Sequence, residues 1–224
     1  MSRKDTFSRV KEVGIIPAIR SSDPDKAVHA TEAIHVGGIP VVEVSLAMSG
    51  ALKVLEAVAK ACSNDVLVGA GSVLDGTNVR DAASAGARFI VTPGFSSDAV
   101  DKAGELDLAV FVGALTPSEV QVASASGADA IKLFPCYAMG GPRYLRSLRG
   151  QYPQVDLIAS GGVGIDNCSE YFRAGACAIG VGGEIADAES MAAGDHRVFT
   201  VRARRLRKAV HETRDLLKGF RPSE

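Results

Sequence analysis

Two ionisable residues of this sequence lie inside otherwise apolar segments. Lys132 is found in Ala-Ile-Lys-Leu-Phe, residues 130–134, whereas the other eight lysines fall in segments rich in polar residues. Glu43 lies in Val-Val-Glu-Val-Ser-Leu, residues 41–46, and is the one acidic residue central to an apolar segment of this kind. Burying such a charge costs of the order of several kcal/mol unless it is paired or neutralised. A protein therefore retains a buried charge chiefly where the group has a chemical task.

A buried lysine beside a carboxylate is suited to imine chemistry. Removal from water favours the neutral amine, which can condense with a ketone to form a Schiff base. The protonated imine withdraws electrons from the adjacent carbon, and a nearby carboxylate can shuttle protons for dehydration and carbon–carbon cleavage. The pair predicts Schiff-base aldol chemistry, with Lys132 as the nucleophile and Glu43 as the general acid/base. The structural alternative is a buried ion pair without chemistry.

The elements that would position these residues alternate along the chain. Short apolar segments rich in β-branched residues are separated by longer amphipathic ones, and their continuous hydrophobicity is typical of parallel strands covered on both faces. With no break in composition, the pattern favours one closed α/β barrel, a (β/α)8 TIM barrel forming a single domain over residues 1–224. The alternative is an open doubly wound sheet, but Arg20-Ser21-Ser22 after the first strand is no Gly-rich dinucleotide turn. The predicted strands are 15–19, 41–46, 66–70, 88–92, 108–112, 130–134, 155–159 and 178–181.

Helix signals fill the segments between the strands. Asp23, followed by proline, and Thr116, followed by proline and by Glu119 three positions on, predict N-caps. Residues 5–13 form an extra helix that is expected to close the N-terminal face of the barrel, and residues 196–219 form the last helix. In a barrel, chemistry sits at the C-terminal ends of the strands, and inward residues of even-numbered strands share a layer. Strands 2 and 6 should therefore bring Glu43 and Lys132 together.

Glycine-rich loops follow three of the predicted strands. Residues 69–73 follow strand 3, Gly161 and Gly162 follow strand 7, and Gly182 and Gly183 follow strand 8. Loops after strands 7 and 8 commonly build a phosphate site from backbone N–H groups. The four glycines after strands 7 and 8 are the predicted phosphate site.

In the order and spacing of its motifs, the sequence resembles the KDPG/KHG aldolases, which cleave 2-keto-3-deoxy-6-phosphogluconate or 4-hydroxy-2-oxoglutarate. The resemblance covers almost the whole chain. Its markers are VEV at 42–44, VGAGSVL at 68–74, VTPG at 91–94, IKLFP at 131–135 and SGG at 160–162.

The resemblance implies a role for each candidate site residue. Lys132 would be the Schiff-base lysine and Glu43 the general acid/base. It also implies that the enzyme needs neither a metal nor an organic cofactor and assembles as a homotrimer. The substrate-binding residues would be Arg20, Ser72, Pro93, Phe134 and Ser160, with Gly161, Gly162, Gly182 and Gly183 at the phosphate.

Two positions depart from the family pattern. Ala47 stands where the family's phosphogluconate enzymes usually have an arginine, and Arg20 is the obvious substitute for that cationic contact. Gly183 stands where many members have a serine in the phosphate loop. Glu184 follows immediately and would repel a phosphate if it pointed inward.

Bulk composition sets further expectations. The net charge of −1 predicts no attraction to nucleic acid or to an anionic membrane. Four cysteines without a Cys-x-x-Cys pair, a charged start and no apolar run of about 20 residues point to a cytoplasmic protein without a membrane span.

The leading interpretation is a class I aldolase that cleaves a 2-keto-4-hydroxy acid to pyruvate and an aldehyde. The favoured substrate is 2-keto-3-deoxy-6-phosphogluconate, which would give glyceraldehyde 3-phosphate as the aldehyde. 4-Hydroxy-2-oxoglutarate or another unphosphorylated 2-keto acid is an alternative substrate. A sugar-phosphate isomerase or epimerase, and a non-catalytic barrel that binds a phosphorylated metabolite, are the alternative functions.

Overall fold

Eight parallel strands form a closed barrel in the computed structural model, which describes residues 1–62 and 65–219. Each strand pairs with the next in the chain, and β8 pairs with β1. This architecture confirms the (β/α)8 barrel and all eight predicted strands. The strands are β1 (Ile15–Ile19), β2 (Val41–Ser45), β3 (Leu67–Gly71), β4 (Phe89–Val91), β5 (Ala109–Ala114), β6 (Ala130–Leu133), β7 (Leu157–Ser160) and β8 (Ala178–Val181).

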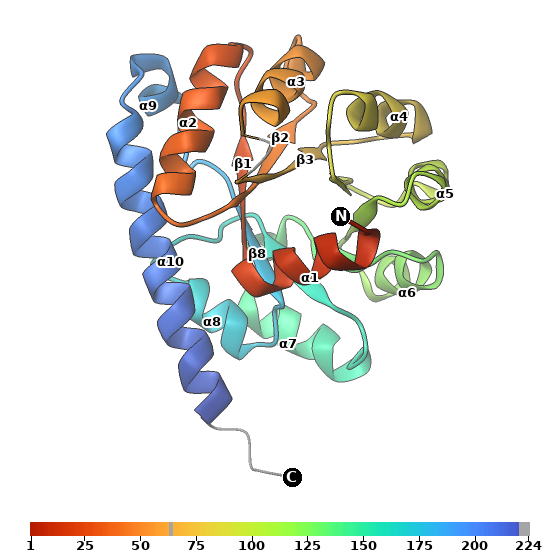
Figure 1. Cartoon of the computed structure of the whole chain (residues 1–224). Helices are drawn as coiled ribbons and strands as arrows, with labels where there is room; N and C mark the ends of the chain where they lie inside the picture. The colour runs from red at the N-terminus through yellow and green to blue at the C-terminus, as the bar shows by residue number, and fades with distance from the viewer. Residues whose placement is uncertain (63–64, 220–224) are drawn as a thin grey trace.

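Helices surround this barrel, and the long α10 lies along α2 and α8 (Figure 1). None of the helices in the described part of the chain has the length and apolarity that crossing a bilayer requires. The helices are α1 (Arg3–Val13), α2 (Pro24–Val36), α3 (Ala51–Cys62), α4 (Gly76–Ser84), α5 (Ser97–Glu105), α6 (Pro117–Ala125), the 3-10 helix η1 (Cys136–Met139), α7 (Pro142–Gln151), α8 (Cys168–Arg173), α9 (Ala188–Ala193) and α10 (His196–Gly219).

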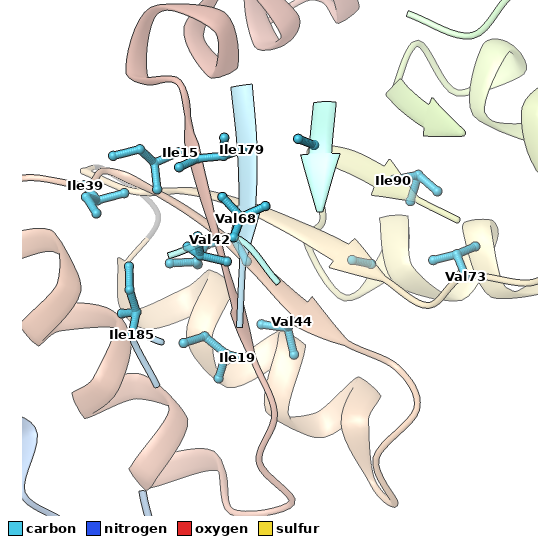
Figure 2. Packing of buried hydrophobic residues seen from close by; sticks show 14 of the residues in the cluster. Ile15, Ile19, Ile39, Val42, Val44, Val68, Val73, Ile90, Ile179 and Ile185 are labelled. Carbon is cyan, nitrogen blue, oxygen red and sulfur yellow. The ribbon is translucent and has the colours of Figure 1, made fainter. Parts of the chain in front are cut away.

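The larger of two apolar clusters fills the layer between the strands and the surrounding helices. Ile19, Val44 and Val68 contribute to it from the strands (Figure 2), and Ile34 and Leu55 contribute from α2 and α3. Removing this apolar surface from water stabilises the fold by about 25 cal/mol per Å². Burial of both faces explains why the strands read as continuous apolar runs.

The second cluster fills the lower half of the barrel and involves α1. The Phe111 ring lies 5.4 Å from the ring of Phe89 and 5.7 Å from that of Phe7 on α1, centroid to centroid. Val10 of α1 is fully buried in the same cluster. The Arg3 side chain also donates to the carboxylate of Asp129, which accepts the backbone N–H of Val110. The extra N-terminal helix therefore closes the bottom of the barrel, as predicted.

The predicted N-caps are confirmed. Asp23 accepts backbone N–H groups of α2, and Thr116 and Glu119 form a reciprocal capping box on α6. Asn167, at the N-terminus of α8, does not cap that helix through its side chain. Its amide instead bridges the preceding loop, because Nδ2 donates to the Gly162 carbonyl and Oδ1 accepts the Gly164 N–H.

Candidate active site

Lys132 and Glu43 project into the barrel interior from β6 and β2. The Lys132 Nζ lies 3.8 Å from the Glu43 Oε1, and the two side chains are 13% and 8% exposed. The juxtaposition expected from strand parity is therefore present. At this separation the groups form an ion pair, which a single proton transfer converts into a neutral amine beside a carboxylic acid.

Glycines on neighbouring strands leave space for the Glu43 side chain and for the loop at Pro93. A Cβ atom at Gly71 of β3 would lie 1.9 Å from the Glu43 Oε1. A Cβ at Gly113 of β5, which is in register with Lys132, would lie 2.3 Å from the backbone of Pro93. The upper half of the barrel interior is thus hollow where the lower half is filled by aromatic rings.

A cavity of about 330 Å³ opens above this pair at the C-terminal end of the barrel. Its size is that of a small-molecule site. It brings together the candidate residues chosen from the sequence: Lys132, Glu43, Arg20, Ser72, Pro93, Phe134, Ser160, Gly161, Gly162, Gly182 and Gly183. Sequence reasoning had assigned no binding role to Ile16, Ala18, Val163, Gly180, Val181 and Glu184, which also line it. The sequence did contain a signal for Ile16 and Ala18, because they alternate along β1 in step with Arg20 and so point to the same side of the strand.

Ser72 enters the cavity from an unusual backbone conformation. Its φ is 58°, in the left-handed region that non-glycine residues rarely adopt. The Ser72 Oγ lies 3.1 Å from the Oγ of Ser45, which is 2% exposed, and either hydroxyl can donate. The strained conformation and this partner hold the Ser72 hydroxyl at the cavity wall.

Phe134 and Pro93 form apolar walls around the amine. The Lys132 Nζ lies 5.2 Å from the centroid of the Phe134 ring, within range of a cation–π interaction. Next to Pro93, the Thr92 Oγ1 accepts the backbone N–H of Gly113 at 3.0 Å, which ties this loop to β5. Both walls exclude water from one side of the amine.

Backbone groups dominate the side of the cavity formed by β7 and β8. Gly161 and Gly162 have φ values of 84° and 70°, which glycine adopts without strain. After β8, the N–H groups of Ile185 and Ala186 both donate to the Gly182 carbonyl and close a tight turn. Polar backbone groups are therefore fixed opposite the apolar walls.

Cys136 does not line this cavity although it follows Lys132 closely in sequence. Its side chain is fully buried, and burial raises the pKa of its thiol to about 11. The thiol is inert at neutral pH, and Cys136 has a packing role.

Fold and site together define a class, the barrel enzymes that carry a lysine beside a carboxylate at the open end. The family model for KDPG and KHG aldolases matches residues 7–201. The chain belongs to this aldolase family, and it is a carbon–carbon lyase.

Named relatives agree with this assignment. The 2-dehydro-3-deoxy-phosphogluconate aldolase of Treponema pallidum is 31% identical over 87% of this chain and 92% of its own length. The KHG/KDPG aldolase of Escherichia coli K12 is 30% identical over 85% of this chain and 89% of its own length.

Solved structures of related aldolases superpose closely. The KDPG aldolase of Legionella pneumophila, with pyruvate captured at low pH as a covalent carbinolamine intermediate, has a TM-score of 0.84 and 27% identity. The match covers 90% of this chain and 97% of that one. A native KDPGal structure has the same TM-score and 28% identity, with 90% and 96% of the two chains covered.

Proposed function

We propose that this protein is a class I aldolase that cleaves a 2-keto-4-hydroxy acid to pyruvate and an aldehyde through a Schiff base on Lys132. The observation that carries the proposal is the buried Lys132–Glu43 pair, 3.8 Å apart, at the floor of a cavity of ligand size. A lysine amine attacks a carbonyl only when deprotonated, and the adjacent carboxylate is the group able to accept its proton.

In the cleavage direction, the Lys132 amine attacks the C2 ketone and forms a carbinolamine. Glu43 returns a proton to the departing water, which leaves a protonated imine. Glu43 then takes the C4 hydroxyl proton as the C3–C4 bond breaks, and the bonding electrons move into the imine to give an enamine. The aldehyde departs, C3 is protonated, and hydrolysis releases pyruvate and restores the amine.

The other candidate residues position the substrate in this proposal. The Ser72 hydroxyl holds the carboxylate of the pyruvate half, and Ser160 lies near the ketone. Phe134 and Pro93 confine the reacting carbons between apolar walls. A distal phosphate would reach Gly161, Gly162, Gly182 and Gly183, and Arg20 supplies a cation on the same side.

The first substrate to test is 2-keto-3-deoxy-6-phosphogluconate, because several relatives are named for it. The product would then be glyceraldehyde 3-phosphate. The alternative is 4-hydroxy-2-oxoglutarate or another unphosphorylated 2-keto acid, which the name of the Escherichia coli relative supports.

Borohydride trapping tests the mechanism directly. Incubation with pyruvate and borohydride should add a reduced pyruvyl mass to Lys132, located by peptide mass spectrometry. Lys132→Ala should abolish the adduct and the turnover, whereas Lys60→Ala, at an exposed lysine of α3, should retain both. Turnover without an adduct would instead support an isomerase- or epimerase-like acid–base mechanism, and neither turnover nor adduct would support a non-catalytic barrel.

The proposal extends to assembly, domain organisation and location. It includes a homotrimer, supported by an apolar groove that adjoins the active cavity and is lined by Leu46, Met48, Leu52 and Leu74. A related chain also belongs to a cage built from symmetric oligomeric domains. Sedimentation equilibrium should give three times the mass of one chain. The proposal also includes a single domain over residues 1–224 and a cytoplasmic location. Four unpaired cysteines support the cytoplasmic location.

A further inference from the structure

Two oppositely charged side chains flank the turn that follows β8. The Arg20 Nη1 lies 2.8 Å from the position that a Cβ would take on Gly182. The Glu184 Oε2 lies 2.9 Å from the corresponding position on Gly164, in the loop after β7. Both residues line the active cavity, and neither forms an ion pair within the part of the chain that the structure describes.

Glu184 is an exposed residue on a fixed turn, and its side chain lies over Gly164. The next residue, Ile185, is 1% exposed and packs in the core (Figure 2), and its N–H closes the turn onto Gly182. The Cγ, Cδ and Oε2 atoms of Glu184 all lie about 3 Å from the place of a Gly164 Cβ. The absence of a side chain at Gly164 provides the space in which Glu184 lies.

The cavity that Glu184 lines also contains residues whose backbone groups are of the kind that bind anions. Gly162, Val163 and Gly183 line the cavity, and their N–H groups have no hydrogen-bond acceptor among the described residues. Three free backbone N–H groups beside Arg20 would suit a phosphate, which carries about −1.5 to −2 charges at neutral pH. Glu184 adds a full negative charge to the same loops and offsets the charge of Arg20.

We propose that Glu184 is a specificity-determining residue that disfavours a phosphate at the distal end of the substrate and favours a free hydroxyl there. Arg20 offers N–H donors and Glu184 offers carboxylate acceptors on the wall of one cavity, and a hydroxyl group can bond to either kind of partner. A phosphate carries more than one negative charge at neutral pH and is repelled by the carboxylate. This inference rests on the proposed aldolase function and refines the substrate of the same cavity.

The test compares Glu184→Gln, which removes the charge and keeps the shape, with Glu189→Gln on the exposed surface of α9 as the matched control. The substrates are 2-keto-3-deoxygluconate and its 6-phosphate. We expect Glu184→Gln to raise the ratio of kcat/KM, phosphorylated over unphosphorylated, about tenfold, equivalent to 1.4 kcal/mol. Calorimetric titration with inorganic phosphate should show tighter binding by a similar factor. The Glu189→Gln control should change neither quantity.

Gly164→Ala provides a second variant, because its Cβ must displace the Glu184 side chain. It should move the substrate ratio in the same direction as Glu184→Gln. An unchanged ratio in Glu184→Gln, or an equal change in Glu189→Gln, would overturn the role of Glu184.

Failure of the aldolase proposal has a different signature. In that case no variant releases pyruvate from either compound, and borohydride traps no adduct on Lys132. An adduct together with turnover and an unaltered ratio leaves the aldolase proposal intact and removes only the role of Glu184.

Discussion

The Lys132–Glu43 pair should show a large energetic coupling in a double-mutant cycle. The variants are Lys132→Met, Glu43→Gln and the combination, which keep the side-chain lengths in a tightly fitted space. Two unit charges 3.8 Å apart attract by about 1 kcal/mol at the dielectric constant of water and by about 4 kcal/mol at an effective value near 20. Both side chains are nearly buried, so we expect a coupling of about 2–4 kcal/mol.

The α10 helix offers a matched control. The Lys208 Nζ and the Glu212 Oε1 are also 3.8 Å apart, but their side chains are 76% and 62% exposed. Solvent screening should reduce the coupling of this pair to about 0.3–0.5 kcal/mol. Lys208→Met, Glu212→Gln and their combination complete the second cycle.

Urea unfolding at pH 7, followed by circular dichroism, measures the free energy of unfolding of each variant. The interior single variants should each lose more stability than the surface ones, because each leaves a nearly buried partner without its counter-charge. A coupling of the interior pair no larger than that of the surface pair would refute the ion pair.

Three further predictions follow from burial and capping. Burial raises the thiol pKa of Cys136 to about 11 and that of Cys177 to about 12. Both thiols should therefore react with iodoacetamide at pH 8 far more slowly in native protein than in urea, which peptide mass spectrometry measures. Equal reaction rates in the two conditions would contradict this burial. Val10→Ala should lower the free energy of unfolding by about 1–3 kcal/mol in urea titrations, and no loss would mean that α1 does not seal the barrel. Asp187, whose pKa is held well below its usual range by hydrogen bonds from the Ser190 N–H and then from Arg202, caps α9. Asp187→Ala should cost about 1 kcal/mol of stability above pH 5. The difference in stability between the wild type and Asp187→Ala should shrink below about pH 4. A carboxyl with a lowered folded-state pKa stabilises the fold above its unfolded pKa and loses this effect as pH falls. A difference that stays constant with pH would argue against this role of Asp187.

The strands and the central pair were predictable because both rest on local rules. Burial on two faces makes each strand an apolar run, so one charged residue within a run is conspicuous. Strand parity then placed Lys132 and Glu43 in one layer without knowledge of any distance. The family resemblance supplied the weaker positions, such as Ser72, whose hydroxyl carries no comparable signal in the sequence.

The remaining differences between the predicted and the observed elements come from long-range contacts that a single segment of sequence does not encode. The strand expected at 108–112 continues as β5 to Ala114, because Gly113 and Ala114 pair with Lys132 and Leu133 despite their modest strand preference. The short α9 was not anticipated, although Asp187 is a suitable N-cap. The orientation of Glu184 depends on the room above Gly164, which only the folded loops reveal.

The aromatic rings beneath the Lys132–Glu43 pair determine the path by which reactants and products enter and leave the cavity. With Phe7, Phe89 and Phe111 filling the lower barrel, the cavity is closed at its floor and opens at the C-terminal end of the barrel. In the proposed reaction the pyruvate half is tethered at the floor, and the aldehyde lies between it and the mouth. The aldehyde must therefore leave first. An aldehyde that accumulates outside can re-enter before the enamine is protonated, so the same cavity can form carbon–carbon bonds as well as break them.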